Sequence, residues 1–179
     1  MEREHRNIED SVSQGASQLK SQILVYNNLS DYIAFNQPIS DVLIGDYDNI
    51  FSMYEQYTAT VDPVLSSLKY FNPNINQITI YLDKNIVKHD TMVDSLQTIE
   101  GEKWYRQNES SLSQKVKWII DAENKTSFSA RTMPIMEQNK QKGILYLDVN
   151  YDSLFAGFDD ISRAVSYTHL RAHETGRNL

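Results

Sequence analysis

The stretch INQITIYLD, from Ile75 to Asp83, decides the fold that we predict for this chain. Its side chains alternate in character, which is typical of a strand that is covered on at least one face. One side of the extended chain carries Ile78, Ile80 and Leu82, and the other carries Thr79 and Tyr81. Helical patterns precede this stretch and short strands follow it, so the sequence predicts an α+β fold.

The first 36 residues predict one long helix. Apolar residues from Ile8 to Ile33 recur at steps of three and four, which keeps them on one helix face. At the usual rise per residue, such a helix would be roughly 45 Å long. Its first 14 residues are polar, which leaves two interpretations: a solvated helix end, or a helix that extends toward a partner chain or a membrane.

A second helical element follows a predicted break. We expect Gln37-Pro38 to end the first helix, because the residue before a proline avoids helical backbone angles. A new apolar stripe runs from Ile50 to Leu68. Asp62-Pro63 lies inside this stripe, and as an N-cap followed by proline it would split the element into two helices. The sequence leaves one helix or two as alternatives.

The rest of the chain predicts a sheet of about five strands. We expect an antiparallel sheet, with the long helix and the second helix packed on it. After the strand at Ile75–Asp83, the predicted elements are a strand at 86–89, a short helix at 102–108, strands at 115–121, 126–135 and 143–149, and a helix at 151–158. The last two strands are expected to form an antiparallel hairpin.

Composition excludes several classes of function. The 179 residues carry a net charge of -7 and no basic cluster, which argues against nucleic-acid binding. The chain has no cysteine, so thiol catalysis, disulfides and thiolate metal sites are excluded. It also lacks an apolar run of the roughly 18 residues that a membrane span needs, and we identify no signal peptide.

The last 14 residues do not continue the pattern of the chain. SYTHLRAHETGRNL, from Ser166 to Leu179, closely resembles a translated sequencing adapter. We therefore treat it as a non-native tail, outside the fold prediction, and expect the natural chain to be cut off near residue 165.

No motif predicts an enzyme, a metal site or a cofactor. His169 and His173 are four apart but lie in the tail without a third ligand. Asp148, Asn150 and Asp152 imitate the start of a calcium loop, but serine stands where the loop needs glycine. A strand end and a helix cap explain this triplet better. The sequence has neither a phosphate-binding glycine loop nor a nucleophile elbow.

One group of residues has the character of a small-molecule pocket. Aromatic side chains with a few convergent polar groups are what such a pocket requires. The predicted ligand-binding residues are Trp104, Tyr105, Arg131 and Asp148, joined by Tyr81, Trp118 and Tyr146. The alternative interpretation is that the tryptophans belong to the core and that Arg131 pairs with a surface acid.

The order of these segments resembles a Cache domain, the PAS-like extracytoplasmic sensor of bacterial transmembrane receptors. The segments that carry the resemblance are the long helix, the second helix, the ITIY strand, the Trp-Tyr helix, SARTMPI and GILYLDVNYDSLF. They cover residues 5 to 160, and the similarity is strongest to sensor histidine kinases found beside AraC-type regulators. It implies a stalk helix at 1–36 and a membrane-distal Cache half at 37–165, ahead of the non-native tail at 166–179, with the membrane helices and the kinase missing.

The resemblance also implies a ligand class. Some amine- and amino-acid-sensing Cache domains carry a tyrosine and an arginine ahead of a Trp-Tyr pair, with an aspartate on a later strand. Trp104, Tyr105 and Asp148 match, whereas Gln97 and Glu102 replace the tyrosine and the arginine. That arginine would bind a ligand carboxylate. The resemblance therefore implies a neutral or cationic ligand, with carbohydrate-related signals as one class.

We therefore expect a non-enzymatic sensor domain on the outer face of a bacterial plasma membrane. It would need no cofactor and would signal through its N-terminal helix within a homodimer, attached to the membrane only through missing flanking helices. Two alternatives stay open. The same domain can belong to a methyl-accepting chemoreceptor, or the chain can be a structural dimerisation domain whose pocket is filled by side chains.

Overall fold

The computed structural model describes residues 2–158, so the predicted tail, with His169 and His173, lies outside the described residues. The fold is α+β, as predicted from the sequence. Contacts divide the chain into two compact units. The first combines the chain up to Val25 with the segment that starts at Tyr151, and the second is Tyr26–Asn150.

The predicted long helix is α1 (Glu2–Ala34). Its residues up to Val25 belong to the first unit, together with α6 (Tyr151–Leu154) and a 3-10 turn, η3 (Ala156–Phe158). Gly15 and Gly157 approach closely within this unit. A Cβ added at Gly15 would lie 2.8 Å from the carbonyl oxygen of Gly157, so a larger residue would push the two segments apart.

The first helix ends before Gln37-Pro38, as predicted, and a further helix starts there in the second unit. There α2 (Gln37–Ile44) begins directly after Asn36. The Asn36 side chain accepts a hydrogen bond from the amide of Ile39 at 3.0 Å. Pro38 fits the first turn, where a helix does not need the missing N–H. The predicted break is confirmed, but the helix directly after it was not predicted, because it depends on the cap that asparagine and proline form together.

The next helix, α3 (Ile50–Phe71), is continuous through Pro63, so the split that Asp62-Pro63 allowed does not occur. Proline inside a helix removes a hydrogen bond and costs about 3 kcal/mol. Burial of one face offsets this cost. The buried side chains recur every four residues, at Met53, Tyr57, Val61 and Leu65.

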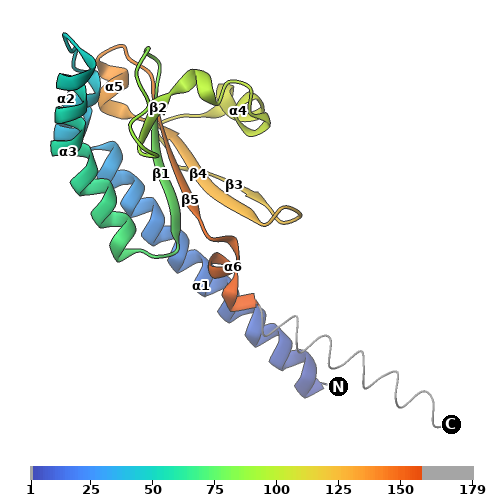
Figure 1. The fold of residues 1–179 in the computed structure, drawn as a ribbon. Helices are drawn as coiled ribbons and strands as arrows, with labels where there is room; N and C mark the ends of the chain where they lie inside the picture. The colour runs from blue at the N-terminus through green and yellow to red at the C-terminus, as the bar shows by residue number, and fades with distance from the viewer. Residues whose placement is uncertain (1, 159–179) are drawn as a thin grey trace. The chain divides into compact units, whose positions relative to one another are not determined.

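The second unit contains a five-stranded sheet with the order β2-β1-β5-β4-β3 (Figure 1). The strands are β1 (Ile75–Leu82), β2 (Val93–Ser95), β3 (Lys117–Asp121), β4 (Thr126–Thr132) and β5 (Gly143–Val149). β4 and β5 form the predicted antiparallel hairpin. The pairs β1–β5 and β3–β4 are also antiparallel, but β2 runs parallel to β1, so the sheet is mixed rather than antiparallel.

The parallel strand corrects a second prediction. Residues 86–89 are not a strand, apart from a single bridge between His89 and Val93. The chain returns along β1, reverses at Asp90, which has a φ of 49°, and only then pairs with β1. This second reversal makes β2 parallel. The sequence around Asp90 does not contain a turn signal strong enough to predict this reversal.

Two short helices complete the second unit. α4 (Lys103–Asn108) agrees with the helix predicted at 102–108. α5 (Pro134–Gln138) replaces the end of the strand predicted at 126–135, since Pro134 starts a helix and cannot extend the strand ladder.

The sheet of the second unit has two distinct faces. Tyr81 is paired with Ile144, and Tyr146 with Ala130, so these four share the face that α4 covers. We call this the α4 face. The opposite side, the helix face, carries the intervening buried residues. They include Ile78, Ile80 and Leu82 of β1 with Leu145, Leu147 and Val149 of β5.

Candidate functional site

An open cavity of about 580 Å³ lies on the α4 face of the sheet. We call it the aromatic pocket. Its lining comes from α4, from β3 and β4 with their connecting turn, and from β5. The lining residues are Glu102, Lys103, Trp104, Gln107, Asn108, Ile119, Ile120, Asp121, Ala122, Thr126, Phe128, Tyr146 and Asp148.

Three aromatic rings form one wall of this pocket. The ring centroid of Trp104 lies 5.1 Å from that of Phe128 and 5.6 Å from that of Tyr146. Phe128 and Tyr146 are 4.8 Å apart. These separations are in the range of favourable edge-to-face and offset contacts. The wall therefore supplies a preformed apolar surface with π faces, suited to a sugar ring or an organic cation.

Tyr105 anchors α4 and so positions Trp104. The Tyr105 side chain is buried, and its hydroxyl donates to Glu109 Oε1 at 2.9 Å. Lys142 Nζ donates to the same hydroxyl at 2.8 Å and to Glu109 Oε1 at 2.9 Å. Lys142 lies just before β5, so this network ties α4 to the sheet. Tyr105 belongs to the core beside the pocket and does not line it.

Asp148 is the half-buried carboxylate of the pocket. It accepts a hydrogen bond from Asn76 Nδ2 at 2.9 Å and a longer one from the Tyr146 hydroxyl at 3.4 Å. Burial raises the pKa of Asp148, and the hydrogen bonds from Asn76 and Tyr146 partly oppose that rise. Burial likewise raises the pKa of the Tyr146 hydroxyl, with Asp148 as the next cause. A cationic ligand would favour the ionised form of Asp148.

Acidic residues outnumber basic ones around the aromatic wall. Glu102 and Asp121 line the pocket together with Asp148, against the single ammonium of Lys103. The lining thus favours a cation or a neutral polar molecule over an anion.

The structure brings five of the seven predicted site residues to the α4 face. Trp104, Tyr146 and Asp148 line the pocket, and Tyr105 and Tyr81 are buried beside it. The centroids of Tyr81 and Tyr146 are 6.1 Å apart. Ligand binding by these residues stays a prediction.

The structure does not bring Arg131 and Trp118 to this group. Arg131 is buried on the helix face, where it pairs with Asp31 of α1 and lies over the Phe35 ring. Trp118 Nε1 donates to Asn27 Oδ1 of α1 at 2.9 Å. Strand alternation explains both placements. Phe128 of β4 and Ile119 of β3 lie on the α4 face. Arg131 is three residues from Phe128 and Trp118 is one residue from Ile119, so both side chains point to the opposite face.

Phe128, Glu102 and Asp121 line the pocket but were not among the predicted site residues. Phe128 had a usable signal. It faces Asp148 in the β4–β5 hairpin register, and directly opposite residues share a sheet face. Asp121 gave no such signal, because its position depends on the turn between β3 and β4. For Glu102, the sequence indicates only that glutamate stands where the resemblance implies an arginine.

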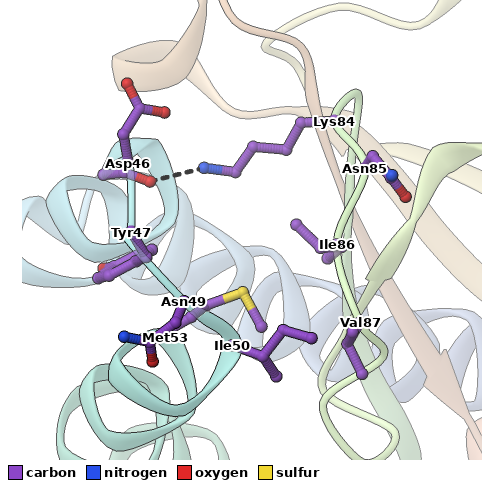
Figure 2. Close-up of a pocket in the computed structure, with 10 residues that line it drawn as sticks. Asp46, Tyr47, Asn49, Ile50, Met53, Lys84, Asn85, Ile86 and Val87 are labelled. Atoms are coloured by element: carbon purple, nitrogen blue, oxygen red, sulfur yellow. Dashed lines mark hydrogen bonds between the residues drawn. The ribbon is translucent and has the colours of Figure 1, made fainter.

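A second cavity, of about 370 Å³, lies elsewhere in the second unit, and we call it the Lys84 cavity. Figure 2 shows it between the α2–α3 connection with the start of α3 and the connection after β1. Its lining is Gly45, Asp46, Tyr47, Asn49, Ile50, Met53, Lys84, Asn85, Ile86 and Val87. Sequence analysis gave no indication of this site.

Lys84 reaches across one end of the Lys84 cavity. Its Nζ donates to the carbonyl oxygen of Gly45 at 2.9 Å (Figure 2). Burial lowers the pKa of Lys84, and the nearby Asp46 carboxylate partly opposes this. The cavity thus has one half-buried amino group at its end.

Comparisons with known proteins return no relative: no family model, curated protein or solved structure matches this chain. Among the described residues, no cluster of three or more potential ligands could hold a metal ion. Within the same residues, no helix is both long and apolar enough to span a membrane.

Proposed function

We propose that this chain is a ligand-sensing domain of the Cache type, from the outer part of a bacterial transmembrane sensor histidine kinase. The observation that carries the proposal is the aromatic pocket, in which Trp104, Phe128 and Tyr146 meet the carboxylate of Asp148. The order of elements, with a long helix before the sheet and α4 over it, agrees with what the resemblance implies.

The proposed ligand is neutral or cationic. Glu102 stands in the pocket lining where an arginine would be needed to bind a ligand carboxylate. Arg131 was the one residue that would have reversed this expectation by pointing into the same space. It is instead buried against Asp31 on the helix face. Free α-amino acids are therefore poor candidates, and polyamines and sugars are better ones.

The same sheet offers a route from the ligand to α1. β4 contributes Phe128 to the pocket and Arg131 to the contact with Asp31. β3 contributes Trp118, whose ring lies 6.2 Å from that of Tyr26 in α1. A ligand that shifts β3 and β4 would thus move side chains that contact α1. Sensor transitions of this kind displace packed helices by about 1–2 Å.

The signal would act between the two protomers of a homodimer in the intact receptor. A methyl-accepting chemoreceptor with the same domain differs only in its cytoplasmic half, so the downstream gene sequence separates these alternatives. A purely structural dimerisation domain would have a filled pocket, and the cavity beside Trp104 supports ligand binding instead.

A thermal-shift screen tests ligand binding. The chain is melted alone and with polyamines, sugars and α-amino acids, and we expect stabilisation by a member of the first two classes. Trp104→Ala should abolish that response because it removes a pocket wall. Trp118→Ala is the matched control, since it removes the other tryptophan from the opposite face of the sheet. Stabilisation by α-amino acids that survives Trp104→Ala would contradict both the site and the ligand class.

A further inference from the structure

The Lys84 cavity has the composition of a second binding site, apart from the aromatic pocket. We propose that it binds a small monocarboxylic acid with an aliphatic body, whose carboxylate meets the Lys84 ammonium and whose carbon chain lies against Ile50, Met53 and Val87. The cavity's volume is within the range of small-molecule sites, which is about 300–1,000 Å³.

Lys84 supplies the charge that selects an acid. A lysine ammonium has three donors, and the Gly45 carbonyl oxygen accepts from one of them. Asp46 is the acidic residue of the lining, and Figure 2 shows its carboxylate directed away from the cavity. α3 begins at the cavity with Asn49 and Ile50, and the positive end of its dipole adds to the field of Lys84.

Aliphatic side chains form the rest of the Lys84 cavity. Figure 2 shows Ile50 and Met53 of α3 on one side and Ile86 and Val87 on the other. Ile50 and Val87 remain 61% and 50% exposed, so the core does not account for their apolar surface. An aliphatic chain between these walls would remove that surface from water, which is favourable in proportion to the area buried.

Two other polar groups of the lining have partners within the protein. The Tyr47 hydroxyl donates to the carbonyl oxygen of Val42 at 2.6 Å. Asn49 Oδ1 accepts from the amide of Ser52 at 2.9 Å as the cap of α3. Because the Asp46 carboxylate points away from the cavity, discrimination between an acid, an alcohol and an amine of equal length would depend on Lys84.

A methyl-detected NMR titration of the whole chain tests the proposal. The probes are hexanoate, hexanol and hexylamine, which share a carbon chain and differ in the charge of the head group. We expect hexanoate to shift the methyl signals of Ile50, Met53, Ile86 and Val87 saturably. Hexanol should bind at least about tenfold more weakly, because it lacks a charge-assisted hydrogen bond to Lys84, and hexylamine should bind no better than hexanol.

Variants of the cavity separate charge from fold. Lys84→Met should weaken hexanoate binding about tenfold, and Lys84→Arg should retain most of it. Lys88→Met is the matched control, since that exposed lysine pairs with Asp94 and does not line the cavity. Val87→Asp keeps Lys84 but puts a negative charge in the aliphatic wall, so it should abolish hexanoate binding. This variant tests the cavity even if Lys84→Met does not fold.

Three results would overturn the proposal: no saturable methyl shift with hexanoate, equal affinity for hexanoate and hexanol, or equal losses in Lys84→Met and Lys88→Met. Trp104→Ala separates the two sites. It should leave the hexanoate titration unchanged. The proposal for the Lys84 cavity can therefore be contradicted while the proposal for the aromatic pocket is supported, and the reverse.

Discussion

Asp148 is the residue whose ionisation would link stability to the proposed ligand binding. Burial raises its pKa above the usual 3.8, so the folded state holds the proton more tightly than the unfolded chain does. Its contribution to the free energy of unfolding is therefore largest below the usual pKa and is lost as the pH rises through the raised pKa. Above the raised pKa the carboxylate is ionised at the expense of stability, as expected for a group that is proposed to bind a cation.

Asp148→Asn should therefore increase the free energy of unfolding at pH 7 and flatten its decline above about pH 4. The asparagine oxygen can still accept from Asn76, so the hydrogen bond need not be lost. Urea denaturation at a series of pH values measures this. The same variant should lose its response to polyamines. A variant that is less stable than the parent at pH 7, with polyamine binding intact, would contradict this role.

Arg131 contributes to stability rather than to the aromatic pocket. Its guanidinium is buried, pairs with Asp31 and lies 5.4 Å from the centre of the Phe35 ring. Asp31→Asn should lower the free energy of unfolding by about 1–3 kcal/mol, because it leaves a buried charge without its carboxylate. Chemical denaturation checks this against Glu55→Gln, an exposed carboxylate of α3 for which we expect a change within about 0.5 kcal/mol. Equal effects of the two variants would show that the ion pair contributes little.

At the scale of elements, α4 is held over the sheet by the hydrogen-bond network of Tyr105, Glu109 and Lys142. Hydrogen bonds from Lys142 and Tyr105 lower the pKa of Glu109. The pKa of Lys142 is raised because its contacts with Tyr105 and Glu109 outweigh burial, which acts in the opposite direction. Both shifts favour the charged forms, the Glu109 carboxylate and the Lys142 ammonium, that the network needs.

Lys142→Gln should loosen α4. It removes the ammonium that connects this helix to the sheet, so hydrogen exchange of the amides at 103–108 should become severalfold faster. Lys140→Gln removes an exposed lysine of the same turn and should leave that exchange unchanged. Exchange that responds equally to both variants would exclude the anchoring role.

Regular periodicity made part of this fold predictable. The alternation of INQITIYLD placed β1 and its two faces, and apolar spacing placed α1 and α3. β5 lies at the predicted residues, since Gly143–Val149 is apolar and bounded by turn signals. These elements carry their own pattern over seven residues or more, so distant contacts were not needed to identify them.

Elements that depend on one residue or on a distant partner were missed. The start of α2 depends on the Asn36 cap, and the parallel strand β2 on the reversal at Asp90. The candidate site was predictable where two residues of one strand are an even number apart and so share a face, as Tyr146 and Asp148 do on β5. Arg131 and Trp118 were misplaced because the sequence did not fix which face of the sheet each side chain would occupy.

At the scale of the molecule, α1 is the proposed output of the domain. Single cysteines can be introduced at residues 3 to 20 for disulfide cross-linking. The chain has no cysteine of its own that could react in their place. If the chain belongs to the proposed receptor, we expect cross-links between protomers of the intact receptor at positions spaced three or four apart, with yields that change when ligand is added. Uniform absence of cross-links, with and without ligand, would remove the proposed dimer signal.

The central claim is that a ligand binds against Trp104, and tryptophan fluorescence tests it most directly. The chain has two tryptophans, one on each side of the sheet, so Trp118→Phe leaves Trp104 as the only tryptophan, which is excited selectively at the long-wavelength edge of its absorption. Titration with putrescine, glucose and alanine should produce a saturable change in Trp104 emission with putrescine or glucose and none with alanine. The claim is contradicted if alanine alone produces the change, or if no probe does.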